Sequence, residues 1–218
     1  MCFSATSSFV SGTVVGVVGI GTIVQVRHAR ELLLGALPLM FAAHQIEEGF
    51  VWLYLRGHVP QSTGNWAILL YIVFAHALLI AISPWSMWLI EPKKTRRWLL
   101  LPLVLLGTAL CCYALWALFG APVHAQIRRH GIEYDDPVTG VGWFAALYIL
   151  ATCAPPFLSS YPWMIIFGVL ILVGLIVVAT YKAIYLTSVW CAIAALVSTL
   201  IYVHFWRVRH QLAVPAEN

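Results

Sequence analysis

Two adjacent carboxyl residues, Glu47 and Glu48, lie inside an apolar stretch from Gly35 to Leu55 that is long enough to cross a lipid bilayer. His44 precedes them by three and four residues, which on a helix places its imidazole on the same face as either carboxyl. Gln45 is likewise within one turn of Glu48. Ionisable groups are costly in hydrocarbon and mark functional sites there by default. The glutamate pair is therefore the first candidate for chemistry.

Three chemistries fit this set of residues. Imidazole and carboxylate are ligands of catalytic zinc, and His76 and the thiolate of Cys2 could complete such a site. A bound zinc ion would activate a water molecule for hydrolysis, with one glutamate as general base. The paired carboxyls could instead take up and release protons. Haem held between His44 and His76 is a third hypothesis, with less support in the sequence.

A purely structural role is the alternative to all three chemistries. The two glutamates could pair with the histidines only to fix the packing of the helices, and one carboxyl could be structural while the other is functional. The protein would then be a non-catalytic accessory subunit or a ligand-binding protein of a larger membrane complex.

Composition places the chain among integral membrane proteins. Hydrophobic residues make up 62% of the 218 residues, charged residues only 9%, and the mean hydropathy is +0.91. Soluble domains carry about 25% charged residues. None of the five cysteines forms a C-x-x-C motif, and four of them lie in apolar stretches, so no disulfide framework is expected. The net charge of +4 reflects basic residues between apolar stretches and does not indicate nucleic-acid binding.

Hydropathy predicts an all-α fold, a single bundle of seven transmembrane helices over residues 1–218. A loop over 120–140 is predicted to be external, either solvated or capping the bundle. Helix-breaking prolines, Pro155 and Pro156, should end the fifth span. The predicted spans are 8–26, 32–55, 66–90, 98–119, 141–159, 163–181 and 184–206.

Basic residues predict the orientation of this bundle. Eight lysines and arginines fall on one side of the predicted spans and four on the other. Because cytoplasmic loops are enriched in Lys and Arg, the N-terminus is expected outside and the C-terminus in the cytoplasm. We expect a multi-pass protein of the bacterial inner (plasma) membrane. Its partners would be the lipid bilayer and other membrane subunits or further copies of the chain.

Helix geometry brings several of these polar residues to one depth. Glu47 lies about 22 Å along the second span from its cytoplasmic end, and His76 lies about 15 Å below the outer end of the third. Ser188 and Cys191 fall in the outer part of the last span, and Cys2 just precedes the first. These positions predict a polar pocket that opens to the outside.

Small residues on the first span predict how it packs. Ser8, Gly12 and Gly16 recur at a spacing of four, which forms a narrow face that lets a neighbouring helix approach closely.

The opening Met-Cys-Phe-Ser-Ala-Thr-Ser-Ser-Phe resembles the start of a family of small uncharacterised bacterial multi-span membrane proteins that begin Met-Cys-Phe-Ser-Ala. Similar stretches run from Ala36 through Gln45 to Gly49, from His130 to Tyr134 and from Ser188 to Cys191. The resemblance implies a shared helical membrane fold and no particular activity. It also draws attention to Cys2, Gln45, Glu48, His130, Tyr134 and Cys191.

Taken together, these patterns predict an outward-facing intramembrane pocket that acts on a membrane-embedded substrate. Glu47 and Glu48 are the predicted catalytic residues, and His44, His76 and Cys2 are the predicted metal ligands. The remaining predicted pocket residues are Gln45, His130, Tyr134, Ser188 and Cys191.

Overall fold

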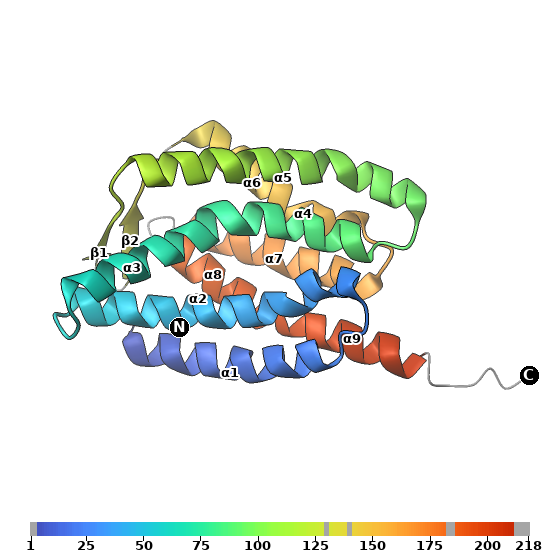
Figure 1. Cartoon of the computed structure of the whole chain (residues 1–218), viewed down its shortest axis with the longest axis horizontal. Helices are drawn as coiled ribbons and strands as arrows, with labels where there is room; N and C mark the ends of the chain where they lie inside the picture. Colours follow the sequence, from blue (N-terminus) through green and yellow to red (C-terminus); the bar gives the residue numbers. More distant parts are fainter. Residues whose placement is uncertain (1–3, 129–130, 139–140, 182–185, 212–218) are drawn as a thin grey trace, which may run out of the picture.

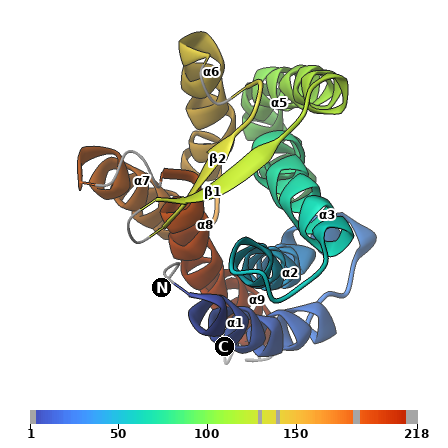
Figure 2. The same ribbon diagram turned by 90° about the vertical axis from the view of Figure 1, so that its left-hand side faces the viewer.

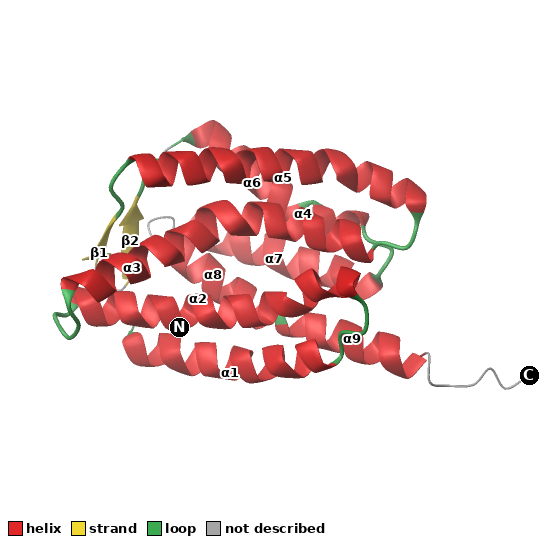
Figure 3. Cartoon of the chain, viewed as in Figure 1, coloured by secondary structure: helices red, strands yellow, loops and turns green. Residues whose placement is uncertain are grey.

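The structure is a computed structural model that describes residues 4–128, 131–138, 141–181 and 186–211, with side chains described for the same residues except 181, 186–188 and 211. Helices make up most of it (Figure 3). The elements in chain order are α1 (Ala5–Val24), η1 (Ala29–Glu31), α2 (Leu32–Leu55), α3 (Gln61–Ile72), η2 (Val73–Leu78), α4 (Leu79–Ile90), α5 (Lys94–Gly120), β1 (His124–Arg128), β2 (Gly131–Asp135), α6 (Gly142–Cys153), η3 (Pro155–Leu158), α7 (Pro162–Tyr181), α8 (Leu186–Val197) and α9 (Thr199–Gln211).

Helices occur in each of the seven stretches predicted from hydropathy. The helix α6 ends at Cys153, directly before the proline pair that was predicted to stop it. The glutamate-bearing α2 is not among the helices apolar enough to count as membrane spans by composition. Within the described residues five segments are long and apolar enough, which is compatible with a membrane protein: Ala5–Val24, Gln61–Ile90, Lys94–Gly120, Pro162–Thr180 and Val189–His210.

The first two helices run antiparallel and side by side, with α1 below α2 in Figure 1. A Cβ added at Gly12 would lie 3.0 Å from the carbonyl oxygen of Ala42 and 2.9 Å from the side chain of Ile46. At Gly16 the nearest atom, the Cβ of Ala42, would be 3.5 Å away. The predicted small-residue face of α1 is therefore confirmed, and α2 packs against it.

A π-helical turn, η2, joins α3 to α4 within one helical rod (Figure 1). The N–H of Leu79 donates to the carbonyl of Phe74, five residues back instead of four. The carbonyl of Ala75 instead accepts a hydrogen bond of 2.7 Å from the Tyr148 hydroxyl of α6. Turns of this kind often occur at functional sites.

The predicted loop over 120–140 contains a β-hairpin, which departs from an all-α fold. The strands β1 and β2 pair antiparallel, with Gln126 opposite Glu133. Side chains alternate along a strand, so Ile132 and Tyr134 of β2 are buried on the bundle while Glu133 is partly exposed. Figure 2 shows the hairpin lying across one end of the bundle. It therefore caps that end.

Ion pairs and hydrogen bonds tie together the opposite end of the bundle, on the right in Figure 1. Arg209 of α9 pairs with Glu31, and the buried carboxyl of Glu91 accepts a hydrogen bond of 2.7 Å from the backbone N–H of Ser160. Burial raises the pKa of Glu31, but hydrogen bonds from the Arg27 backbone and the Arg209 side chain outweigh it. The net result is a pKa below the ordinary value.

Candidate functional site

The two adjacent glutamates of α2 face different neighbours, because successive residues of a helix point about 100° apart. Glu48 is fully buried and accepts a hydrogen bond of 3.2 Å from the hydroxyl of Ser8 on α1. Gln45 faces the same way, and its carbonyl oxygen accepts a hydrogen bond of 3.0 Å from Ser11. Both side chains thus belong to the interface between α1 and α2.

Glu47 lies instead beside His44, with 3.6 Å between its carboxylate and Nδ1 of the imidazole. Its side chain is 27% exposed, whereas His44 is buried. The imidazole stacks on the ring of Tyr71 at a centroid distance of 4.0 Å, and Tyr71 stacks in turn on Tyr134 at 4.5 Å. A column of three parallel rings therefore connects α2 through α3 to the hairpin.

His76, on the π-helical turn, pairs with an aspartate that sequence reasoning did not select. Its Nδ1 lies 3.2 Å from Oδ2 of Asp136, whose side chain is fully buried. The other oxygen, Oδ1, accepts a hydrogen bond of 3.0 Å from the backbone N–H of Val138. This bond from two residues on is the local turn that aspartate favours. Asp136 precedes Pro137, which signals a turn but not that it reaches a histidine of the bundle.

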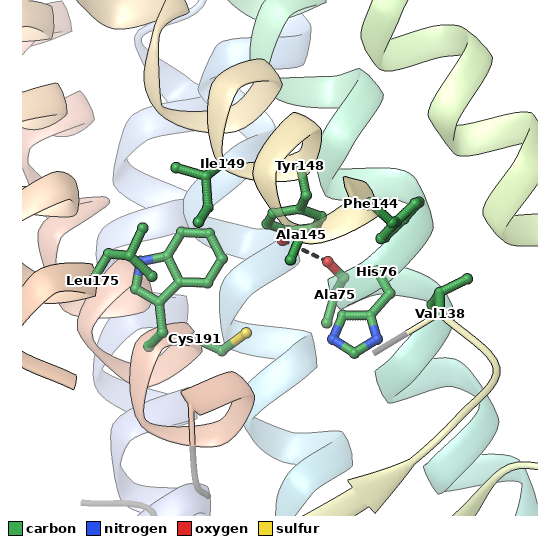
Figure 4. Close-up of a pocket in the computed structure, with 10 residues that line it drawn as sticks. Ala75, His76, Val138, Phe144, Ala145, Tyr148, Ile149, Leu175 and Cys191 are labelled. Atoms are coloured by element: carbon green, nitrogen blue, oxygen red, sulfur yellow. Dashed lines mark hydrogen bonds between the residues drawn. The ribbon is translucent and has the colours of Figure 1, made fainter. Parts of the chain in front are cut away.

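A cavity of about 100 Å³ lies next to this pair, beneath the hairpin (Figure 4). In Figure 4 the imidazole of His76 and the thiol of Cys191 point into the space between them, with Tyr148 behind. Ala145 of α6 is exposed, so the cavity reaches the outer surface of the bundle there. The lining residues are Ala75, His76, Val138, Phe144, Ala145, Tyr148, Ile149, Leu175, Trp190 and Cys191.

Trp190 adds a polar group to this mostly apolar wall. The residue is 7% exposed, and its indole Nε1 has no hydrogen-bond partner among the described residues. Because a buried donor without a partner costs about 1–3 kcal/mol, such groups are rare unless a site uses them. The sequence gives no signal for this role, since tryptophans near helix ends are typical of any membrane protein.

The structure divides the predicted site residues into three groups. Glu48 and Gln45 belong to the α1–α2 interface, and His44, Glu47 and Tyr134 belong to the column of rings or its edge. His76 and Cys191 line the cavity. Cys2 and His130 lie outside the described residues, as does the side chain of Ser188.

Comparison with known families supports the resemblance seen in the sequence. The model of a family of unknown function, DUF6629, matches residues 1–218. The chain belongs to this family. No match is found among curated proteins or among solved structures. Membership of DUF6629 therefore adds no activity, and the chemistry has to be argued from the cavity itself.

Proposed function

We propose that this protein is a multi-pass membrane protein whose cavity binds the hydroxyl-bearing end of an apolar molecule, and that His76 exchanges a proton with that hydroxyl. The pairing of His76 with the buried Asp136 carries the proposal. A carboxylate on Nδ1 holds the imidazole in the tautomer whose Nε2 accepts protons, as in general bases. Asp136 is the orienting residue in this mechanism.

The dimensions and lining of the cavity support this class of ligand. At about 100 Å³ it is smaller than an engineered cavity of about 150 Å³ that holds benzene, so only a few heavy atoms fit. Most lining side chains are apolar, while the Trp190 N–H can donate to a ligand oxygen and His76 can accept its proton. The surface opening at Ala145 lies on a helix flank, where a ligand could enter from hydrocarbon.

We propose seven spans, with the hairpin end and the N-terminus outside and the basic end in the cytoplasm of the inner (plasma) membrane. The excess of Lys and Arg on the side of the α4–α5 turn and the C-terminus supports this orientation. In it the cavity belongs to the outer half of the bundle, since it lies beneath the hairpin.

The zinc hydrolase predicted from sequence is a second version of the same proposal. It requires Cys2, which lies outside the described residues, and within those residues no group of three or more His, Cys, Asp or Glu side chains could hold a metal ion. Elemental analysis of the purified protein tests it. Stoichiometric zinc that is lost in His44→Ala would favour hydrolysis at the predicted ligands over proton exchange at His76.

Photolabelling in vesicles tests binding. The probe is an octanol that carries a diazirine, compared with the same alkyl diazirine without the hydroxyl. We expect adducts on the Phe144–Ile149 peptide from the hydroxyl probe, with severalfold loss in His76→Gln and in Ala145→Leu, which narrows the opening. His58→Gln, an exposed histidine between α2 and α3, is the matched control. Equal labelling by both probes, or unchanged labelling in His76→Gln, contradicts the proposal.

Nitrogen NMR of the histidine rings tests proton placement without any ligand. The His76 signals, identified by their loss in His76→Gln, should report a proton on Nδ1 in the native protein. Asp136→Asn should shift the tautomer toward Nε2–H. A native ring protonated only at Nε2 would leave His76 unable to act as proposed, and a structural accessory subunit would then be the better interpretation.

A further inference from the structure

A second cavity, of about 210 Å³, lies at the basic end of the bundle where α4 is followed by α5. It is separate from the cavity beneath the hairpin and shares none of its lining residues. Its walls combine two cations with aromatic and aliphatic side chains: Trp88, Lys94, Arg97, Trp98 and Leu101.

The positive charge of this cavity is not compensated by the protein. Lys94 and Arg97 are three residues apart on α5 and therefore share a face. Neither forms an ion pair with a carboxylate of the described residues. The nearest acid in sequence, Glu91, is engaged by the N–H and hydroxyl of Ser160 instead. An anion that entered the cavity would find two cations available.

Aromatic packing holds one of these cations in place. The Arg97 guanidinium lies over the ring of Trp88, 4.3 Å from its centroid. Trp88 packs edge-on against Trp85 at 5.5 Å, and the indole N–H of Trp85 donates to Thr108 at 3.0 Å. Stacking uses the face of the guanidinium and keeps its in-plane N–H donors for a planar or tetrahedral anion. The site is thus ordered before any ligand binds.

The cavity also passes from polar to apolar along α5. Lys94, in the first turn, is exposed, whereas Leu101 lies two turns further into the apolar part of the helix. Trp98 lies between them and is 63% exposed, as is typical of tryptophan at the boundary between headgroups and acyl chains. A ligand matched to this gradient has an anionic head and a hydrocarbon tail.

We propose that this cavity binds the phosphate group of an anionic phospholipid from the adjacent membrane leaflet. Arg97 and Lys94 bind the phosphate, and Trp98 and Leu101 contact the start of the acyl chains. Basic pockets beside membrane helices bind lipid headgroups in this way. The inference depends on the protein lying in a membrane but not on the chemistry of His76.

Native mass spectrometry tests the proposal on the full-length protein in mixed micelles with equal amounts of phosphatidylglycerol and phosphatidylcholine. We expect the native protein to retain phosphatidylglycerol preferentially. Lys94→Gln and Arg97→Gln should each reduce that preference about fivefold, the effect of one basic residue near an anionic lipid. Lys93→Gln removes an exposed charge next to the cavity and should change the preference less than about twofold.

Two further results decide the source of the phosphate and the role of folding. A large excess of inorganic phosphate that displaced the lipid would show that the phosphate alone is bound, which overturns the lipid proposal. An unchanged preference in Lys94→Gln, whose exposed side chain has no packing partner to lose, would overturn it as well. Arg97→Lys keeps the charge but loses the stacked fork, and should bind between native and Arg97→Gln levels.

Discussion

Two clusters of buried polar side chains lie in this bundle, one between α1 and α2 and the other beneath the hairpin. In the first, Glu48 and Gln45 accept hydrogen bonds from serines across an interface too close for an added Cβ at Gly12. In the second, Asp136 holds the titratable ring of His76 beside a cavity that also exposes an indole N–H. Both clusters lower the cost of burying a carboxyl group. Only the second leaves room for a ligand.

The difference teaches how to read an intramembrane acid. A carboxyl that faces neutral hydroxyls in a close helix interface joins helices, because nothing else can approach it. A carboxyl that faces an imidazole at a cavity wall sets the tautomer of that ring. The residue with the more conspicuous sequence signal, Glu48, is the structural one on this criterion. The following variants test that division, beginning with the largest expected effect.

Gly12→Val should destabilise the protein by about 1–3 kcal/mol, because its side chain would overpack the α1–α2 interface at Ala42 and Ile46. Thermal unfolding in detergent measures the change. Gly16→Ala is the control, since its Cβ would be in ordinary contact with Ala42 at 3.5 Å. Octanol-probe labelling per folded molecule should stay at the native level in Gly12→Val, and a large loss would mean that the two clusters are coupled.

Glu48→Ala should cost about 1–3 kcal/mol of stability, because it removes the buried acceptor of the Ser8 hydroxyl. Glu48→Gln keeps an oxygen at that position and should cost less. Chemical unfolding of the two variants gives the comparison. If Glu48→Gln were as stable as the native protein yet lost probe labelling, Glu48 would be a functional carboxyl and the division above would fail.

Tyr148→Phe removes the hydroxyl that donates to the Ala75 carbonyl at the π-helical turn. We expect a loss of about 0.5–1.5 kcal/mol, the usual net value of one hydrogen bond. The ring stays in the cavity wall, so probe labelling should fall only modestly. Loss of labelling comparable to that in His76→Gln would instead assign the hydroxyl to ligand binding.

The basic end offers a pH test that involves neither cluster. The pKa of Glu31 lies below its ordinary value of 4.5, so its carboxylate contributes stability above that pH. This contribution is lost as the pH falls through the lower pKa of the folded state. The effect should be about 1 kcal/mol or less. Unfolding midpoints between pH 6 and pH 3, compared with Glu31→Gln, measure it. An identical pH profile in the variant would contradict the assignment.

The helices were predictable because each depends on local hydropathy and helix-breaking residues, as the stop before Pro155 shows. The close approach of α1 to α2 also follows from a local pattern, the spacing of Gly12 and Gly16. The His76–Asp136 pair was not predictable in the same way. It depends on a hairpin that folds back over the bundle, and the packing of Ile132 and Tyr134 that directs it involves residues far apart in the chain.

The candidate metal ligands show the limit of spacing on one helix. His44 and Glu47 do share a face, as three-residue spacing requires, and their side chains approach to 3.6 Å. The sequence could not show that Tyr71 stacks on the same imidazole or that His76 turns toward the hairpin. These contacts depend on how neighbouring helices rotate about their axes, which hydropathy alone does not specify.

The π-helical turn at Val73–Leu78 has a consequence for the whole second half of its rod. One extra residue in a turn rotates every later side chain by about 100° relative to an uninterrupted α-helix. Tyr71, before the turn, and Pro84, after it, therefore present faces to α2 and α5 that a regular helix of the same sequence would not. Deleting a single residue there would shorten the rod by little, yet change the angular phase of all of α4 and with it the register against α5.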